Sequence, residues 1–160
     1  MSHNAPTPQL PPDYEELDFK IEEEEWNEYE LDDNIIIKGR LFLAKIMRDP
    51  NDPKKMSFDL SIPKWAVYAP AHLRGKPSVE LLKDPIKQKT TDKFRVHINK
   101  SHEPWNRYRI LRTGQEVKIK LAVDEILRFT NAFDQNGSPF YQVPNGVSIS
   151  IKGNQPHQGQ

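Results

Sequence analysis

The chain has 160 residues, which suits one ordinary domain or two very small ones, and it contains no cysteine, which excludes a disulfide framework, a thiol nucleophile and a cysteine-ligated metal. Its formal net charge is zero, and its hydrophobic fraction of 36% lies below the globular average of roughly 45–50%. No apolar run approaches the roughly 18 residues of a membrane span and no secretory signal pattern is visible, so we expect a cytoplasmic protein that does not enter a membrane.

Composition divides the chain into five segments. Residues 1–14 are rich in proline and residues 153–160 are polar without a pattern, so both are predicted to be disordered tails. Between them we predict a β unit over residues 15–70, a connector with a short helix over 71–93, and a second β unit over 94–152.

The two predicted β units repeat one another. The matched segments are 24–31 with 103–110, 38–48 with 118–128, and, more weakly, 60–63 with 141–144. The offset is 79, then 80, then 81 residues, and both one-residue shifts fall where loops are expected. The repeat predicts an all-β fold of two tandem five-stranded, small barrel-like units. Units of this size are marginal alone, so they are expected to pack together.

A tryptophan, an asparagine and a tyrosine recur at matched positions. Alternation places Tyr29 and Tyr108 on the inward face of their strands, and Trp26 and Trp105 on the opposite face. The recurrence indicates either a packing unit, with the asparagine bonded to backbone, or a pair of aromatic contacts for a ligand. Packing is favoured, because a duplicated fold must repeat its core but need not repeat its site.

The long strand that follows in each unit keeps apolar residues at every second position and then breaks the alternation. The break predicts a β-bulge or sharp bend at residues 44–45 and 124–125. In the connector, residues 77–83 are expected to form one or two helical turns that Pro85 ends, and residues 87–93 a mobile loop. In the last strand, valine and isoleucine are expected to point inward and serine outward.

Catalytic motifs are missing from the sequence. The five histidines are His3, His72, His97, His102 and His157, and none has a partner at a recognisable spacing. The acidic run 22–25 is interpreted as a solvated edge, and the spacing of a calcium loop is absent. We therefore expect no catalytic residue, no metal site and no cofactor, and a protein that is not an enzyme.

The zero net charge hides an asymmetry along the chain. Residues 11–33 hold twelve acidic side chains and one basic one, whereas residues 71–120 hold thirteen bases and five acids, a local charge of +8. Such asymmetry indicates either an anionic partner or an acidic part that lies on the basic part.

The most functional-looking feature is a difference between the units. Outward positions of the first hairpin carry Glu28 and Glu30 beside Lys38 and Arg40, which can pair across strands. The matched positions of the second hairpin are all basic. The candidate binding residues are Trp105, Arg107, Arg109, Arg112, Lys118 and Lys120.

Three partners could neutralise this basic face: the acidic run 22–33 of the same chain, a single-stranded nucleic acid, or an acidic protein. Basic residues interleaved with tryptophan and tyrosine suit nucleic acid, but such binders are more often basic overall. The sequence therefore favours a non-catalytic interaction or adaptor module with an unknown protein partner. Single-stranded nucleic-acid binding through the second unit is the alternative.

Overall fold

A computed structural model describes residues 13–153, so most of both predicted tails lies outside the described residues. Strand makes up 57% and helix 9%, which confirms the all-β class. The strands are β1 (Glu15–Leu17), β2 (Phe19–Glu23), β3 (Asn27–Leu31), β4 (Ile36–Gly39), β5 (Phe42–Asp49), β6 (Asp52–Ser61), β7 (Trp65–Tyr68), β8 (Lys93–Arg95), β9 (Ile98–His102), β10 (Trp105–Ile110), β11 (Glu116–Val123), β12 (Leu127–Phe133), β13 (Pro139–Gln142) and β14 (Asn145–Lys152). The helical elements are a 3-10 turn, η1 (Ala71–Leu73), and two short helices, α1 (Val79–Leu82) and α2 (Pro85–Thr90).

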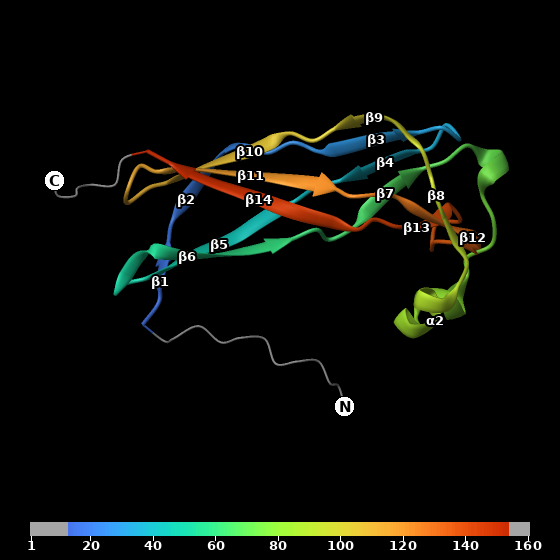
Figure 1. Ribbon diagram of the computed structural model, residues 1–160, viewed down its shortest axis with the longest axis horizontal. Coiled ribbons are helices and arrows are strands. Elements are labelled where there is room, and N and C mark those ends of the chain that lie inside the picture. The colour runs from blue at the N-terminus through green and yellow to red at the C-terminus, as the bar shows by residue number, and fades with distance from the viewer. Residues whose placement is uncertain (1–12, 154–160) are drawn as a thin grey trace.

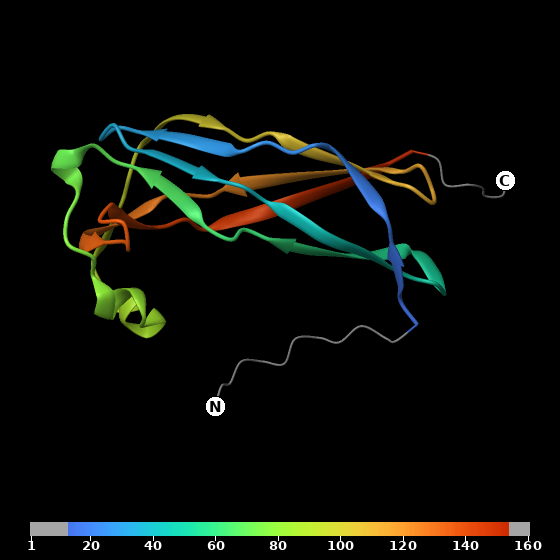
Figure 2. The ribbon, with the colours of Figure 1, turned by 180° about the vertical axis from the view of Figure 1, so that it is seen from behind.

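Two pairs of consecutive strands, β2–β3 and β9–β10, run antiparallel to each other along the long axis of the molecule (Figures 1 and 2). β2 pairs with β10, and β3 pairs with β9. Because β3 follows β2 and β10 follows β9, residues 19–31 of the first half lie beside residues 98–110 of the second half.

Four sheets extend from these strands. Two have four strands, in the orders β14-β11-β10-β2 and β7-β4-β3-β9, and two have three, in the orders β1-β5-β6 and β13-β12-β8. Both four-stranded sheets thus combine strands of both halves. No sheet closes into a barrel within residues 13–153, so the predicted five-stranded, barrel-like units are not confirmed. The physical reason is that β2 and β9 each pair with the hairpin of the other half instead of their own.

The two main hydrophobic clusters are built from both halves. The first cluster contains Leu17, Leu41, Leu43 and Ile46 together with Tyr108, Ile110, Val117, Ile119 and Leu121. The second contains Tyr29, Leu31, Ile35, Ile37 and Ala69 together with Val96, Ile126, Tyr141 and Val143. Burial of apolar surface is the dominant favourable term in folding. The halves therefore share their cores and are not separate beads.

The predicted alternation of the aromatic residues is confirmed. Tyr29 and Tyr108 are 1% and 0% exposed, whereas Trp26 and Trp105 are 44% and 36% exposed. The tyrosines therefore belong to the cores, and the tryptophans lie at the surface.

The repeated asparagines also bond to backbone, as predicted for a packing unit. The side-chain amide of Asn27 donates to the carbonyl of Leu121 at 2.8 Å, and the side-chain oxygen of Asn106 accepts the N–H of Glu25 at 3.1 Å. Both bonds cross between the halves, so each asparagine satisfies a backbone group of the other half.

The two predicted bends differ in form. The pairing of β5 with β6 shifts register between Leu43 and Lys45, which is the bulge expected at residues 44–45. At residues 124–125 the chain leaves strand altogether, since β11 ends at Val123 and β12 begins at Leu127. Buried Ile126 fills the second core at that break.

The connector is more helical than predicted. The short helix predicted over residues 77–83 is α1, which ends at Leu82, before Pro85. Pro85 also begins a second helix, α2, because Asp84 precedes it as an N-cap and the Asp84 carboxylate accepts the N–H groups of Ile86 and Lys87. Residues 87–90, expected to be loop, therefore lie in α2. Leu81 of α1 packs in a third cluster, which connects the helices to β12.

Candidate interaction surface

Five of the six predicted binding residues lie on the outward face of the β10–β11 hairpin, and Arg112 lies in the turn between the two strands. The pairing across the hairpin differs from the expected one at a single position. Trp105 is opposite Lys120 and Arg107 is opposite Lys118. Arg109, expected beside a lysine, is opposite Glu116. The face therefore carries one carboxylate among its cations.

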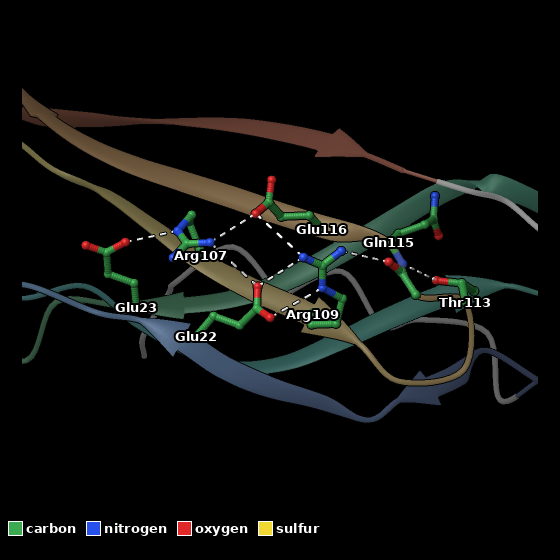
Figure 3. Close-up of polar contacts among 8 residues, drawn as sticks. Glu22, Glu23, Arg107, Arg109, Thr113, Gln115 and Glu116 are labelled. Atoms are coloured by element: carbon green, nitrogen blue, oxygen red, sulfur yellow. Dashed lines mark hydrogen bonds and ion pairs between the residues drawn. The ribbon is translucent and has the colours of Figure 1, made fainter.

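Arg107 and Arg109 belong to an ion-pair network with β2 (Figure 3). The guanidinium of Arg107 lies 2.9 Å from the carboxylate of Glu23, and that of Arg109 lies 3.2 Å from Glu22. Glu116 lies 3.4 Å from Arg107 and 3.8 Å from Arg109. The acidic strand of the first half thus lies along the edge of the basic hairpin and neutralises these two arginines.

The third arginine is paired in the same way. Arg112 lies 3.0 Å from Glu15 of β1, and Glu15 also lies 3.0 Å from Arg48 of β5. All three arginines of the candidate site are therefore matched by carboxylates of the same chain. The sequence raised this internal pairing as one of three alternatives but gave no signal that β2 in particular lies beside β10.

The contacts of Glu23, Arg107 and Glu15 shift the pKa of each of these three groups toward its charged form. The hydrogen bond from Arg107 lowers the pKa of the Glu23 carboxyl, and the same contact, with that of Glu116, raises the pKa of Arg107. Hydrogen bonds from Arg48 and Arg112 likewise lower the pKa of Glu15. Each shift favours the charged form, as expected for an opposite charge within contact distance.

Lys118 and Lys120 are arranged differently. Their ammonium groups lie 5.2 Å and 5.8 Å from the centroid of the Trp105 ring, within the range of a cation–π contact. Neither forms an ion pair with any residue in the described range 13–153. We call Trp105, Lys118 and Lys120 the basic-aromatic patch. It is the part of the candidate site whose cations have no carboxylate.

At the matched positions of the first half, both cations are paired with carboxylates. Arg40 lies over the ring of Trp26 at 5.7 Å and contacts the carboxylate of Glu24 at 3.2 Å. Lys38 lies 3.4 Å from Glu28. The two tryptophans therefore differ in their electrostatic surroundings, and only the second has cations without acidic partners.

Two partly buried hydrogen bonds were not predicted from the sequence. The hydroxyl of Tyr29 donates to Glu103, and that of Tyr108 donates to Glu24, each at 2.8 Å. Burial raises the pKa of both tyrosines well above the usual range, so both remain protonated donors. The recurrence of glutamate two residues before each tryptophan was the available signal.

Removing the charges of the arginines and removing those of the lysines are expected to affect the stability of the protein differently. The double variant Arg107→Gln/Arg109→Gln should lower the urea midpoint, because Glu22, Glu23 and Glu116 then lose their partners. The matched double variant Lys118→Gln/Lys120→Gln should leave the midpoint nearly unchanged, since it removes no ion pair, and the loss of two exposed cation–π contacts with Trp105 is offset by the loss of repulsion. Equal loss of stability in both variants would show that the lysines also have a structural role.

A pocket of about 400 Å³ lies between β7 and β13, away from this face. Trp65, Val67 and Phe140 supply its apolar lining, and Asp134 is the carboxylate among its lining residues. That carboxylate accepts the N–H groups of residues 136 and 138 in a turn, so it is committed to local structure.

Comparison with protein-family models, curated proteins and solved structures found no match to this chain. In residues 13–153, no group of histidine, aspartate and glutamate is arranged to hold a metal ion. The same residues contain no helix long and apolar enough to span a membrane.

Proposed function

We propose that the protein is a non-catalytic interaction module of the cytoplasm that binds an acidic segment of a protein partner. The basic-aromatic patch is the proposed contact. The observation that carries the proposal is that the arginines of the candidate site are paired with carboxylates and its lysines are not. Arg107, Arg109 and Arg112 are neutralised within the chain, whereas Lys118 and Lys120 are not.

The position of the patch supports a compact acidic ligand. Trp105 supplies exposed aromatic area at 36% exposure, and aromatic residues are enriched at interaction surfaces. The lysines hold two positive charges above it, and charge complementarity guides specificity and association rate. A glutamate- or aspartate-bearing segment would meet both features.

Single-stranded nucleic acid is the second candidate, favoured by the same tryptophan with its flanking lysines. The internal pairing of the three arginines argues against it. A groove that follows a nucleic-acid backbone needs a row of cations available to contact phosphates. Among the predicted binding residues, only Lys118 and Lys120 are cations without a carboxylate partner.

The internal repeat is proposed as the origin of this arrangement. We propose that residues 15–70 and 94–152 descend from one duplicated β unit. The pairing supports it: β3 pairs with β4 and β9, and β10 pairs with β11 and β2, which are the matched strands of the two halves. The charge difference at the second tryptophan would then be a specialisation of one copy.

Binding of defined probes tests the proposal. A short peptide of alternating glutamate and valine and a single-stranded oligothymidine are titrated against the full chain, with tryptophan fluorescence as the readout, at low and physiological salt. We expect the peptide to bind, and Lys118→Gln/Lys120→Gln to weaken it roughly tenfold.

The matched control removes two exposed lysines elsewhere, Lys54→Gln/Lys55→Gln on β6, with the same change in net charge. This control should leave peptide affinity within about twofold of the parent. Equal weakening by both pairs would contradict a specific patch. Tight, salt-dependent binding of the oligothymidine that Trp105→Ala abolishes would favour the nucleic-acid candidate.

A further inference from the structure

β14 is a long sheet edge with little to prevent pairing with another strand. It spans eight residues, pairs with β11 on one side, and has no strand of residues 13–153 on the other. Its sequence from Asn145 to Ile151 has no charged residue, and the single charge, Lys152, is at its end. Exposed edges of this kind present unpaired N–H and C=O groups to a further strand.

The other edge strands within residues 13–153 are guarded or short. β6 carries a proline and four charged residues, β2 carries three, and β9 carries a lysine and a histidine. β1, β7, β8 and β13 have three or four residues each. Charges, prolines and short length are the usual means of blocking edge pairing. β14 has none of them over its first seven residues.

The apolar face of β14 extends beyond the core. Val147, Ile149 and Ile151 lie opposite Leu121, Ile119 and Val117, which are at most 1% exposed. Residues directly opposite in an antiparallel pair share a face of the sheet. The three β14 side chains therefore project from the core face of the sheet, yet they remain 40%, 42% and 39% exposed. The inward orientation predicted from the sequence is correct, but the edge position leaves them partly uncovered.

The pattern of this strand is complementary to itself. In an antiparallel pair centred on Ile149, Ile149 meets its own copy, Val147 meets Ile151, and Ser148 meets Ser150. Lys152 meets Gly146, so no like charges are opposed. We propose that β14 pairs antiparallel with β14 of a second copy of this chain, centred on Ile149.

A two-fold axis of this kind gives a closed dimer with an isologous interface. The β14-β11-β10-β2 sheets of the two copies become one continuous sheet, and the two apolar rows lie side by side on one face of it. Lys118 and Lys120 lie opposite Ser150 and Ser148 on the other face of the sheet. The dimer therefore places two basic-aromatic patches on one side, although the pairing does not depend on what they bind.

Sedimentation analysis of the full chain over a range of concentrations tests the pairing. We expect a monomer–dimer equilibrium for the parent. Ile149→Lys places two like charges opposite each other at the centre and should weaken dimerisation about 100-fold or more. Ile86→Lys is the matched control, since Ile86 of α2 is 75% exposed and should not affect the equilibrium.

A cross-link gives a second readout that does not depend on the lysine variant folding. The chain has no cysteine, so Ile149→Cys introduces a single thiol. Opposed residues of antiparallel strands have Cα separations of about 4.5–5.5 Å, which a disulfide spans. We expect rapid formation of covalent dimers under mild oxidation, and little with Ile86→Cys.

A monomeric parent at all concentrations would overturn the proposal. So would a dimer that Ile149→Lys leaves intact, open-ended polymers instead of dimers, or equal cross-linking of both cysteine variants. Failure of the acidic peptide to bind, with dimerisation as expected, would instead contradict the proposed function alone.

Discussion

Tyr108→Ala is expected to lower the free energy of unfolding by about 3–5 kcal/mol, in the range of large aromatic truncations in protein cores. Tyr108 is 0% exposed, and its ring meets that of Phe19 edge-on, with centroids 5.8 Å apart. Its hydroxyl also donates to the Glu24 carboxylate. The variant therefore leaves a cavity and removes the donor of a carboxylate with little access to water.

Two further variants separate these contributions in urea titrations. Tyr108→Phe keeps the ring and removes the hydroxyl, so it should cost about 1–3 kcal/mol, because one oxygen of the Glu24 carboxylate loses its donor while the other keeps Arg40. Trp105→Ala removes a larger aromatic from the exposed face of the same strand and should cost less than Tyr108→Ala. A Tyr108→Ala protein within 1 kcal/mol of the parent would contradict the assignment of Tyr108 to the shared core.

The features that sequence predicted well depend on neighbouring residues. Period-two spacing placed Tyr29 and Tyr108 inside and Trp26 and Trp105 outside, because alternate side chains of a strand point to opposite faces. The interrupted spacing located the bulge near Lys45 for the same reason. Each of these inferences needs only a short stretch of chain.

Pairing between distant strands could not be predicted in the same way. Both halves carry nearly the same pattern, so a hairpin such as β10–β11 fits a first strand from either copy. The structure uses β2, which brings Glu22 and Glu23 to Arg107 and Arg109. The sequence showed the opposite charges but not that these strands are neighbours.

In the connector the sequence predicts the first helix but not the second, for a local reason. Pro85 indicates the end of α1 because proline lacks the N–H that a helix interior needs, and α1 does end before it. At the first helical position that N–H is not needed, and Asp84 immediately before it is a good N-cap. The Asp-Pro pair was thus a signal for the start of a helix.

Separating the halves is expected to abolish folding. Fragments 1–76 and 77–160 divide the chain within the connector. Each fragment would expose its side of both mixed clusters, and β2 and β9 would lose the strands they pair with. The net stability of a typical domain is only about 5–15 kcal/mol, so a fragment that loses half of both cores should be unfolded on its own.

Both proposed surfaces belong to a single folding unit made of the two halves. Mixing the two fragments tests most directly whether the halves fold as one unit. The amide NMR spectrum of isotope-labelled fragment 1–76 is recorded alone and after addition of an equimolar amount of unlabelled fragment 77–160. We expect a collapsed, unfolded-type spectrum alone and a dispersed, β-rich spectrum in the mixture. A dispersed spectrum from fragment 1–76 alone, unchanged by its partner, would contradict the shared cores and show two independent units.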